Sequence, residues 1–327
     1  MSTSPYAYRK ESFWLRAGLW VLAVVLMILA VTYQRNTGPT YPRKGVIEAQ
    51  DQSYDYGLIR SDWSIASNEG ALVVVPELGS KSEGKLFWKR FRTTDAFTLV
   101  DMNHEMAKPK RSLLEFLVDL VRGRKNIEEQ PSLVGLLPAQ PAAGKLEYYL
   151  MLTDEGGQEH RIPELAEENV VIRFKDHVPV SILLPHVLLM FFAVLIGMRS
   201  GLAAIFAPSG MRIAAWFALV LMTVGGMVLG PIVQKYAFGD YWTGWPFGGD
   251  WTDNKMLFMW LSWVFAVSII GFRPRRKDII SRVIVVIAAL VMTSVYLIPH
   301  SMGGSELNYE AVDEGIDPAE AIRTGKN

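Results

Sequence analysis

The chain has 327 residues, with 33 lysines and arginines against 33 aspartates and glutamates, no cysteine, and half of its residues hydrophobic. The lack of cysteine excludes a disulfide-stapled secreted protein and a cysteine-ligated zinc or iron–sulfur protein. A net charge of zero argues against nucleic-acid binding, which needs an excess of basic residues to displace phosphate counterions. The mean hydropathy of +0.18 indicates that part of the chain lies in membrane lipid.

The first apolar run, from Ala17 to Tyr33, carries no charge and at about 1.5 Å per residue is long enough to span most of a hydrocarbon core. A cleaved signal peptide is the alternative, because Arg9, Lys10 and Arg16 precede the run. The run does not end in a small-residue cleavage pattern, which favours a retained transmembrane helix.

Further apolar stretches occupy roughly 178–198, 213–233, 256–272 and 283–298, and with the first run they predict a bundle of five transmembrane helices. The polar stretch between the first two spans, rich in proline and glycine, predicts a water-soluble domain. The predicted organisation is therefore an N-terminal cytoplasmic segment with the first helix (1–34), a soluble domain (35–177), a four-helix transmembrane domain (178–300) and an acidic tail (301–327).

Basic residues lie before the first span, between the second and third spans, and between the fourth and fifth spans. With five spans these positions fall on one side, which the positive-inside rule assigns to the cytoplasm. The soluble domain, the loop 235–255 and the tail are then extracytoplasmic. The short loops and the cysteine-free outer domain fit a bacterial inner membrane.

The soluble domain contains several short segments with strand composition, separated by glycine and proline turn signals. They are LFWKRFR (86–92), FTLVDM (97–102), KLEYYLMLT (145–153) and NVVIRF (169–174). The region LLPAQPAAGKLEYYLMLTDEGGQEHRIP resembles the late strands of immunoglobulin-like and fibronectin type III domains, which predicts a β-sandwich. Apolar residues at helical spacing from Ser112 to Gly123 predict a short inserted helix. A sandwich by itself names no function.

Two of the five histidines have similar surroundings: His186 follows a proline near the outer end of the second span, and His300 follows a proline near the outer end of the fifth. An ionisable group in a membrane is costly unless it is paired, lines a cavity or binds something, so both are candidate site residues. The alternative is an interfacial histidine bonded to water or to a carbonyl group.

The outer loop 235–255 combines many aromatic residues with four glycines. An aromatic belt at the headgroup level is one interpretation. A platform for a flat apolar ligand is the other, because aromatic faces pack on planar rings and glycine permits close backbone approach. The acidic residues of this loop are expected to be solvated, because no spacing supports a metal site. The candidate binding residues of the loop are Phe238, Gly239, Tyr241, Trp242, Trp245 and Trp251.

A haem fits both features, because its iron takes neutral imidazole and its porphyrin faces favour aromatic contact. His186 and His300 are the candidate ligands of the iron of a haem b, with the loop as cover and Lys235 or Lys255 as partners of the propionates. Lysine at a span boundary more commonly extends to the interface.

The segment FGDYWTGWPFGGDWTDNK (238–255) and the tryptophan-bearing span after it resemble the tryptophan-rich WWD loop and following helix of haem-handling cytochrome c biogenesis proteins. Gly239, Tyr241 and Trp242 match the family pattern in place. Phe238 stands where that pattern has its first tryptophan, and Trp245 falls one position late. The acidic partner of the pattern is displaced toward Asp250 or Asp253.

The resemblance continues on both sides of the loop. PHVLLMFFAVLIGMRSGLAAI is similar to the histidine-bearing helix of the family, with His186, Val187 and Met190 in place, and His300-Ser-Met-Gly is similar to the family's His-Ser-Tyr-Gly. The resemblance implies that His186 and His300 are the two outer haem ligands.

The function expected from the residues and the resemblance is haem binding or handling of the cytochrome c biogenesis type, with an apocytochrome or an assembly factor docking on the soluble domain. This is a carrier or assembly role more than a hydrolase or transferase activity. A cofactor-free assembly or scaffolding subunit is the alternative. A membrane enzyme that uses the outer carboxylates and histidines has the least support.

Overall fold

The computed structural model describes residues 11–108, 129–165, 168–272, 278–299 and 304–323. The chain forms two compact units. The helical unit contains the described residues up to Pro39 together with Val178–Ser305, and the β unit contains Thr40–His177 and Glu306–Arg323. The β unit is therefore assembled from two stretches of chain, one before and one after the last four apolar helices.

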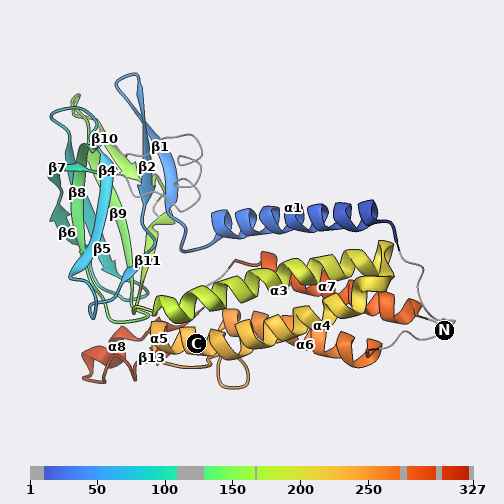
Figure 1. Cartoon of the computed structure of the whole chain (residues 1–327). Helices are drawn as coiled ribbons and strands as arrows, with labels where there is room; N and C mark the ends of the chain where they lie inside the picture. The colour runs from blue at the N-terminus through green and yellow to red at the C-terminus, as the bar shows by residue number, and fades with distance from the viewer. Residues whose placement is uncertain (1–10, 109–128, 166–167, 273–277, 300–303, 324–327) are drawn as a thin grey trace, which may run out of the picture. The chain divides into compact units, whose positions relative to one another are not determined.

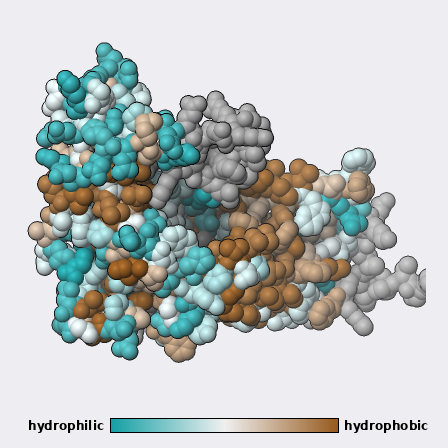
Figure 2. All heavy atoms as spheres, turned by 60° about the vertical axis from the view of Figure 1, so that its left-hand side comes forward, coloured by the Kyte–Doolittle hydropathy of each residue, from teal (hydrophilic) through white to brown (hydrophobic). Residues whose placement is uncertain are grey.

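Five helices in the described part of the chain are long and apolar enough to cross a membrane, judged by length and composition (Figure 1). Each contains most of one apolar stretch predicted from the sequence, so these helices are confirmed, and they indicate a membrane protein. Figure 2 shows hydrophobic residues covering much of the surface of the helical unit, as a lipid environment requires. The helices are α1 (Phe13–Thr37), α3 (Val180–Phe206), the continuous run of η2 (Pro208–Gly210), α4 (Met211–Met222), η3 (Thr223–Leu229) and α5 (Gly230–Phe238), then α6 (Trp251–Ile270) and α7 (Ile279–Leu297).

The helices pack through small and flexible side chains around a buried tryptophan. Trp263 of α6 has no exposed surface and lies in a core of mainly alanines and methionines from α1, α3, α4, α6 and α7. A Cβ atom at Gly201 of α3 would lie 2.6 Å from the Cβ of Ala289 of α7. Small residues of this kind let helix backbones approach closely in lipid, where dispersion contacts drive association.

Two arginines, Arg212 and Arg282, are satisfied by protein groups at the end of the bundle where α3 finishes. Arg212 pairs with Asp278, and both side chains are buried. Arg282 donates hydrogen bonds to the carbonyl groups of Ala204 and Ile205 at 2.6 and 2.7 Å. These carbonyls belong to the last turn of α3, where no following helical N–H group donates to them. Arg282 donates to them instead and so caps the helix.

The β unit contains a six-stranded sheet, a three-stranded sheet and a separate hairpin of β1 with β2. The larger sheet has the order β3-β11-β9-β5-β6 with β10 paired to β9, and the smaller has the order β4-β8-β7. The predicted strands correspond to β5, β6, β9 and β11 and are confirmed. The predicted helix from Ser112 to Gly123 lies outside the described residues. The bounds are β1 (Arg43–Ala49), β2 (Gln52–Leu58), β3 (Ser61–Trp63), β4 (Gly70–Pro76), β5 (Glu83–Arg90), β6 (Thr98–Asp101), β7 (Asn103–Ala107), β8 (Gln130–Pro138), β9 (Lys145–Thr153), β10 (Glu159–Ile162) and β11 (Val170–Lys175).

The two sheets share one apolar core. Along β9 every second residue is buried, so Leu146 and Leu150 point inward with the period of two that strands impose. They meet Val73 of β4 and Leu133 of β8 in the same cluster. Tyr148, fully buried among them, donates its hydroxyl hydrogen to the carbonyl of Ile59 at 2.7 Å, which satisfies its one polar group.

The described part of the predicted acidic tail folds onto the β unit as β12 (Glu306–Leu307), α8 (Tyr309–Asp313) and β13 (Ile322–Arg323). The Tyr309 hydroxyl accepts a hydrogen bond from the Lys145 N–H at 3.0 Å. Burial raises the pKa of Tyr309, so this group stays protonated. The Lys145 ammonium lies 2.6 Å from the Glu306 carboxylate. The tail is thus bound at the first residue of β9.

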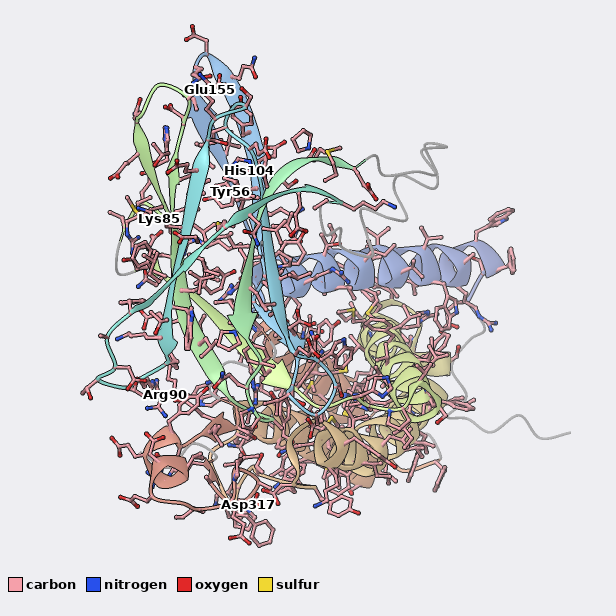
Figure 3. The ribbon with its side chains drawn as sticks, turned by 90° about the vertical axis from the view of Figure 1, so that its left-hand side faces the viewer. Tyr56, Lys85, Arg90, His104, Glu155 and Asp317 are labelled. Atoms are coloured by element: carbon pink, nitrogen blue, oxygen red, sulfur yellow. The ribbon has the colours of Figure 1, made fainter. Side chains whose placement is uncertain are left out.

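Arg90, at the end of β5, connects the tail with a neighbouring loop (Figure 3). Its guanidinium lies 2.6 Å from Asp95 and 2.7 Å from Asp313 of α8. Hydrogen bonds from Arg90 lower the pKa of both carboxyl groups.

We expect Tyr309→Phe to loosen the tail, because the partly buried Lys145 N–H would lose its acceptor at a cost of about 1 kcal/mol. Hydrogen–deuterium exchange of the full chain in detergent should show faster exchange across 306–323. Glu314→Gln, at an exposed position of the same segment, should leave exchange unchanged. Equal protection in Tyr309→Phe and the native chain would contradict this account.

The ion pairs of Arg90 should make stability depend on pH in the acid range. A carboxyl whose folded-state pKa is lowered stabilises the fold fully above its unfolded value, here 3.8, and this stabilisation is lost as the pH falls below that value. The difference in melting temperature between the native chain and Arg90→Gln should therefore be constant from pH 7 to 5 and shrink below about pH 3.8. A difference that is as large at pH 3 as at pH 5 would show that the pairs do not act in this way.

Candidate functional site

His186 lies in the second turn of α3, and its ring is fixed by the backbone of the third span. Its Nδ1 lies 2.8 Å from the carbonyl oxygen of Gly225. A carbonyl oxygen can only accept, so Nδ1 carries the hydrogen. In the neutral ring the Nε2 lone pair is then left for another donor or for a metal. A second hydrogen bond that orients an imidazole in this way is the usual companion of a metal-ligating histidine.

The carbonyl that holds His186 belongs to a π-helical segment, η3, which interrupts the third span. Its glycines permit close packing: a Cβ at Gly225 would lie 2.8 Å from the Cβ of Leu189, and one at Gly226 would lie 2.3 Å from the sulfur of Met256. Short π-helical segments are rare and occur frequently at functional sites. The glycines therefore bring α3 and α6 against this irregular segment and place His186 beside it.

The loop between α5 and α6 is held by two buried aspartates. Asp253 accepts hydrogen bonds from the N–H groups of Thr243 and Gly244 at 2.7 and 3.0 Å and contacts the Thr243 hydroxyl at 3.2 Å. Asp250 caps α6 by accepting from the Thr252 N–H at 2.7 Å. These acids were expected to be solvated, and for Asp250 and Asp253 that expectation is wrong, because their side chains satisfy backbone groups that would otherwise be buried without partners.

The anchored loop presents aromatic side chains at the surface. Tyr241, Trp245 and Trp251 are 59, 68 and 56% exposed, and Phe247 is 72% exposed. Trp242 is only partly exposed, and its indole N–H donates to the carbonyl of Trp245 at 3.1 Å.

Phe238 and Gly239 end α5, and Gly239 adopts a φ of 90° that a residue with a side chain rarely adopts. The glycine thus turns the chain out of the helix and into the aromatic loop.

The two lysines at the edges of the loop have partners inside the protein. Lys255 is buried, and its ammonium donates to the carbonyls of Ile298 and Pro299 at 3.1 and 2.7 Å. Lys235 donates to the carbonyl of Gly239. Lys255 therefore links the start of α6 to the end of α7. The sequence had suggested a haem propionate as its partner and had not indicated this structural role.

His300 lies outside the described residues. The carbonyl of the preceding residue, Pro299, accepts a hydrogen bond from Lys255. The start of α3, the end of α5, the start of α6 and the end of α7 meet at one end of the bundle (Figure 1). The structure thus brings His186, the aromatic loop and the backbone of Pro299 to the same end of the bundle.

The other histidines lie in the β unit. His104 contacts Glu77 at 2.8 Å, His160 contacts Asp154 at 3.2 Å, and His177 lies against the ring of Trp63. Within the described ranges, no group of three or more histidine, aspartate or glutamate side chains is arranged to hold a metal ion.

Sequence reasoning missed the anchoring role of Asp250 and Asp253, although a local signal exists. The two acids stand at the N-cap and at the third helical position of α6. An N-cap acceptor followed three residues later by an acidic residue is typical of a helix start, where free N–H groups need acceptors.

No family model matches the chain, and the search of curated proteins found no match.

We expect Asp253→Ala to release the aromatic loop, because two buried N–H groups would lose their acceptor at about 1–3 kcal/mol each. Limited chymotrypsin digestion of the full chain in detergent should then cut faster after Tyr241 and Phe247, which are exposed in the loop. Asp240→Ala is the matched control, since Asp240 is exposed in the same loop. Unchanged cleavage in Asp253→Ala would mean that the loop is held by other contacts.

Proposed function

We propose that the protein is an integral membrane haem-binding or haem-handling protein of the cytochrome c biogenesis type. The observation that carries the proposal is the orientation of His186: its Nδ1–H is bonded to Gly225, which leaves Nε2 as a ligand. It is supported by the exposed aromatic side chains at the same end of the bundle. The resemblance of the loop and its flanking helices to the WWD family points to the same function.

In this proposal His186 and His300 ligate the iron of a haem b, and Tyr241, Trp245 and Trp251 cover the porphyrin face. Trp242, Phe238 and Gly239 shape the loop. When bound, haem supplies redox chemistry or serves as cargo for a partner. The chain's own residues bind it, orient it and exclude water. An anchored but exposed loop suits a ligand that is held and later released.

The proposal also assigns the membrane orientation and the role of the β unit. Two sheets around a common core support an immunoglobulin-like or fibronectin-like sandwich. Basic residues around the end of α3 support a cytoplasmic position for that end. The site and the β unit then lie outside a bacterial inner membrane, where the β unit docks an apocytochrome or an assembly factor.

The test is the visible spectrum and pyridine haemochrome of the full chain, purified in mild detergent from haem-replete cells. We expect a Soret band in the native protein that is lost or shifted in His186→Ala and in His300→Ala. His177→Ala is the matched control and should keep the native spectrum, because His177 lies in the β unit against Trp63. Absence of haem after reconstitution, or an unchanged band in both site variants, would refute the two-histidine site.

A cofactor-free assembly subunit is the second candidate. It is favoured by the internal partners of Asp250, Asp253 and Lys255, which leave mainly aromatic side chains at the surface of the loop. Such a surface also fits the centre of a protein interface. In that case a haem-free protein would still form a specific complex, and Trp245→Ala would weaken it while Asp240→Ala would not.

A further inference from the structure

An apolar groove of about 550 Å³ lies within the helical unit, away from the aromatic loop. It is bounded by the second half of α1, the end of α3 and one face of α7. Its volume falls in the range of about 300–1,000 Å³ that is common for small-molecule sites. The lining residues are Leu26, Leu29, Ala30, Tyr33, Met198, Gly201, Leu202, Ile205, Val286, Ala289, Leu290, Thr293 and Leu297.

Hydrogen bonds at both ends of α1 connect this helix to neighbouring elements of the helical unit. At one end the Ser209 N–H donates to the Glu11 carboxylate at 3.2 Å. At the other end the Gln34 side-chain amide donates to the carbonyl of Tyr296 at 3.1 Å. Between these contacts Gly201 of α3 and Ala289 of α7 lie against each other in the wall of the groove. Both ends of α1 are thus hydrogen-bonded to neighbouring elements of the helical unit.

The apolar side chains that line the groove favour a hydrocarbon ligand. Thr293 is one of its few polar residues, and its hydroxyl donates to the carbonyl of Ala289 at 2.8 Å within the same helix. A ligand in the groove therefore meets an almost wholly apolar wall. A transmembrane helix, about 10 Å across and 30 Å long, needs several times this volume, so a single flexible chain is the better fit.

A buried cation on α3, next in sequence to a residue that lines the groove, is a second feature of this region. Arg199 directly follows Met198 and is one turn before Leu202, and it is only 7% exposed. Its guanidinium lies over the ring of Trp20 at 5.5 Å, and its Nε has no hydrogen-bond partner among the described residues.

The other charges near Arg199 do not satisfy it. The carboxylate that acts on it is Glu11, which is already bonded to Ser209, and Arg16 adds a like charge. By contrast, Arg212 and Arg282 at the same end of the bundle have protein partners. A buried, incompletely bonded cation in a membrane span is costly and marks a binding position for an anion.

We propose that the groove between α1, α3 and α7 binds one hydrocarbon chain of an anionic phospholipid, whose phosphate pairs with Arg199. Basic positions between helices commonly bind anionic headgroups. This site is separate from the haem proposal and does not depend on it.

The first test measures the lipid retained by the purified full chain, by mass spectrometry, after exchange into nanodiscs of equal phosphatidylglycerol and phosphatidylcholine and then into detergent. We expect phosphatidylglycerol to be retained in preference to phosphatidylcholine. Leu290→Trp, which fills the groove, should lower retention at least about fivefold, a difference of about 1 kcal/mol in binding. Ile287→Trp is the matched control, because Ile287 is similarly exposed on α7 but does not line the groove.

The second test removes or keeps the positive charge at position 199. Arg199→Gln should bind both lipids equally, whereas Arg199→Lys should keep the preference for phosphatidylglycerol. Equal retention in Leu290→Trp and Ile287→Trp, or a preference that survives Arg199→Gln, would overturn the proposal.

A photoreactive phosphatidylglycerol with a diazirine in its acyl chain provides a test on the unmodified chain. Crosslinks should concentrate on the groove segments 26–33 and 286–297 and exceed those on Phe258 and Phe265, which are exposed on α6. Uniform labelling of all exposed apolar residues, or recovery of a protein partner in the groove, would contradict a lipid site.

Discussion

The architecture of the candidate site depends on the carboxylate of Asp253. An irregular loop at the end of a membrane bundle exposes backbone N–H groups that lipid cannot satisfy and that burial makes costly. Asp253 accepts from two of them, and Asp250 closes the helix that follows. Because these hydrogen bonds fix the backbone of a glycine-rich loop, its aromatic rings can remain exposed without the loop collapsing onto the bundle.

The same principle operates at His186. There the irregular segment is a π-helical turn, and the side chain that meets its backbone is an imidazole. Both parts of the candidate site therefore combine an irregular backbone with one polar side chain from a neighbouring regular helix. The two parts differ in the hydrogen-bonding capacity that remains. The aspartate carboxylates accept hydrogen bonds from the backbone, whereas the imidazole of His186 keeps one ring nitrogen available. The haem proposal therefore rests on His186.

The elements with a strong local period could be predicted from the sequence. Runs of apolar residues indicated the positions of the five helices, and the residue composition of 145–153 indicated the strand β9. The contact of Tyr309 with Lys145 could not be predicted, because it joins residues 164 positions apart. The π-helical turn also has no simple sequence pattern, since it depends on how Gly225 and Gly226 meet the helices packed against them. For the site, the sequence placed His186 and the aromatic loop at one end but assigned the loop acids to solvent.

The tail shows how the loop and the β unit are joined along the chain. The Ser305 N–H donates to Asp250 at 3.3 Å within the helical unit, and the next residue, Glu306, pairs with Lys145 in the β unit. One peptide bond therefore connects an anchor of the aromatic loop to an anchor of the tail. A peptide unit is planar and of fixed length, so the backbone freedom between these two contacts is confined to the φ and ψ angles of Ser305 and Glu306. The helical unit and the tail are therefore anchored at adjacent residues of the chain, each by contacts within its own unit.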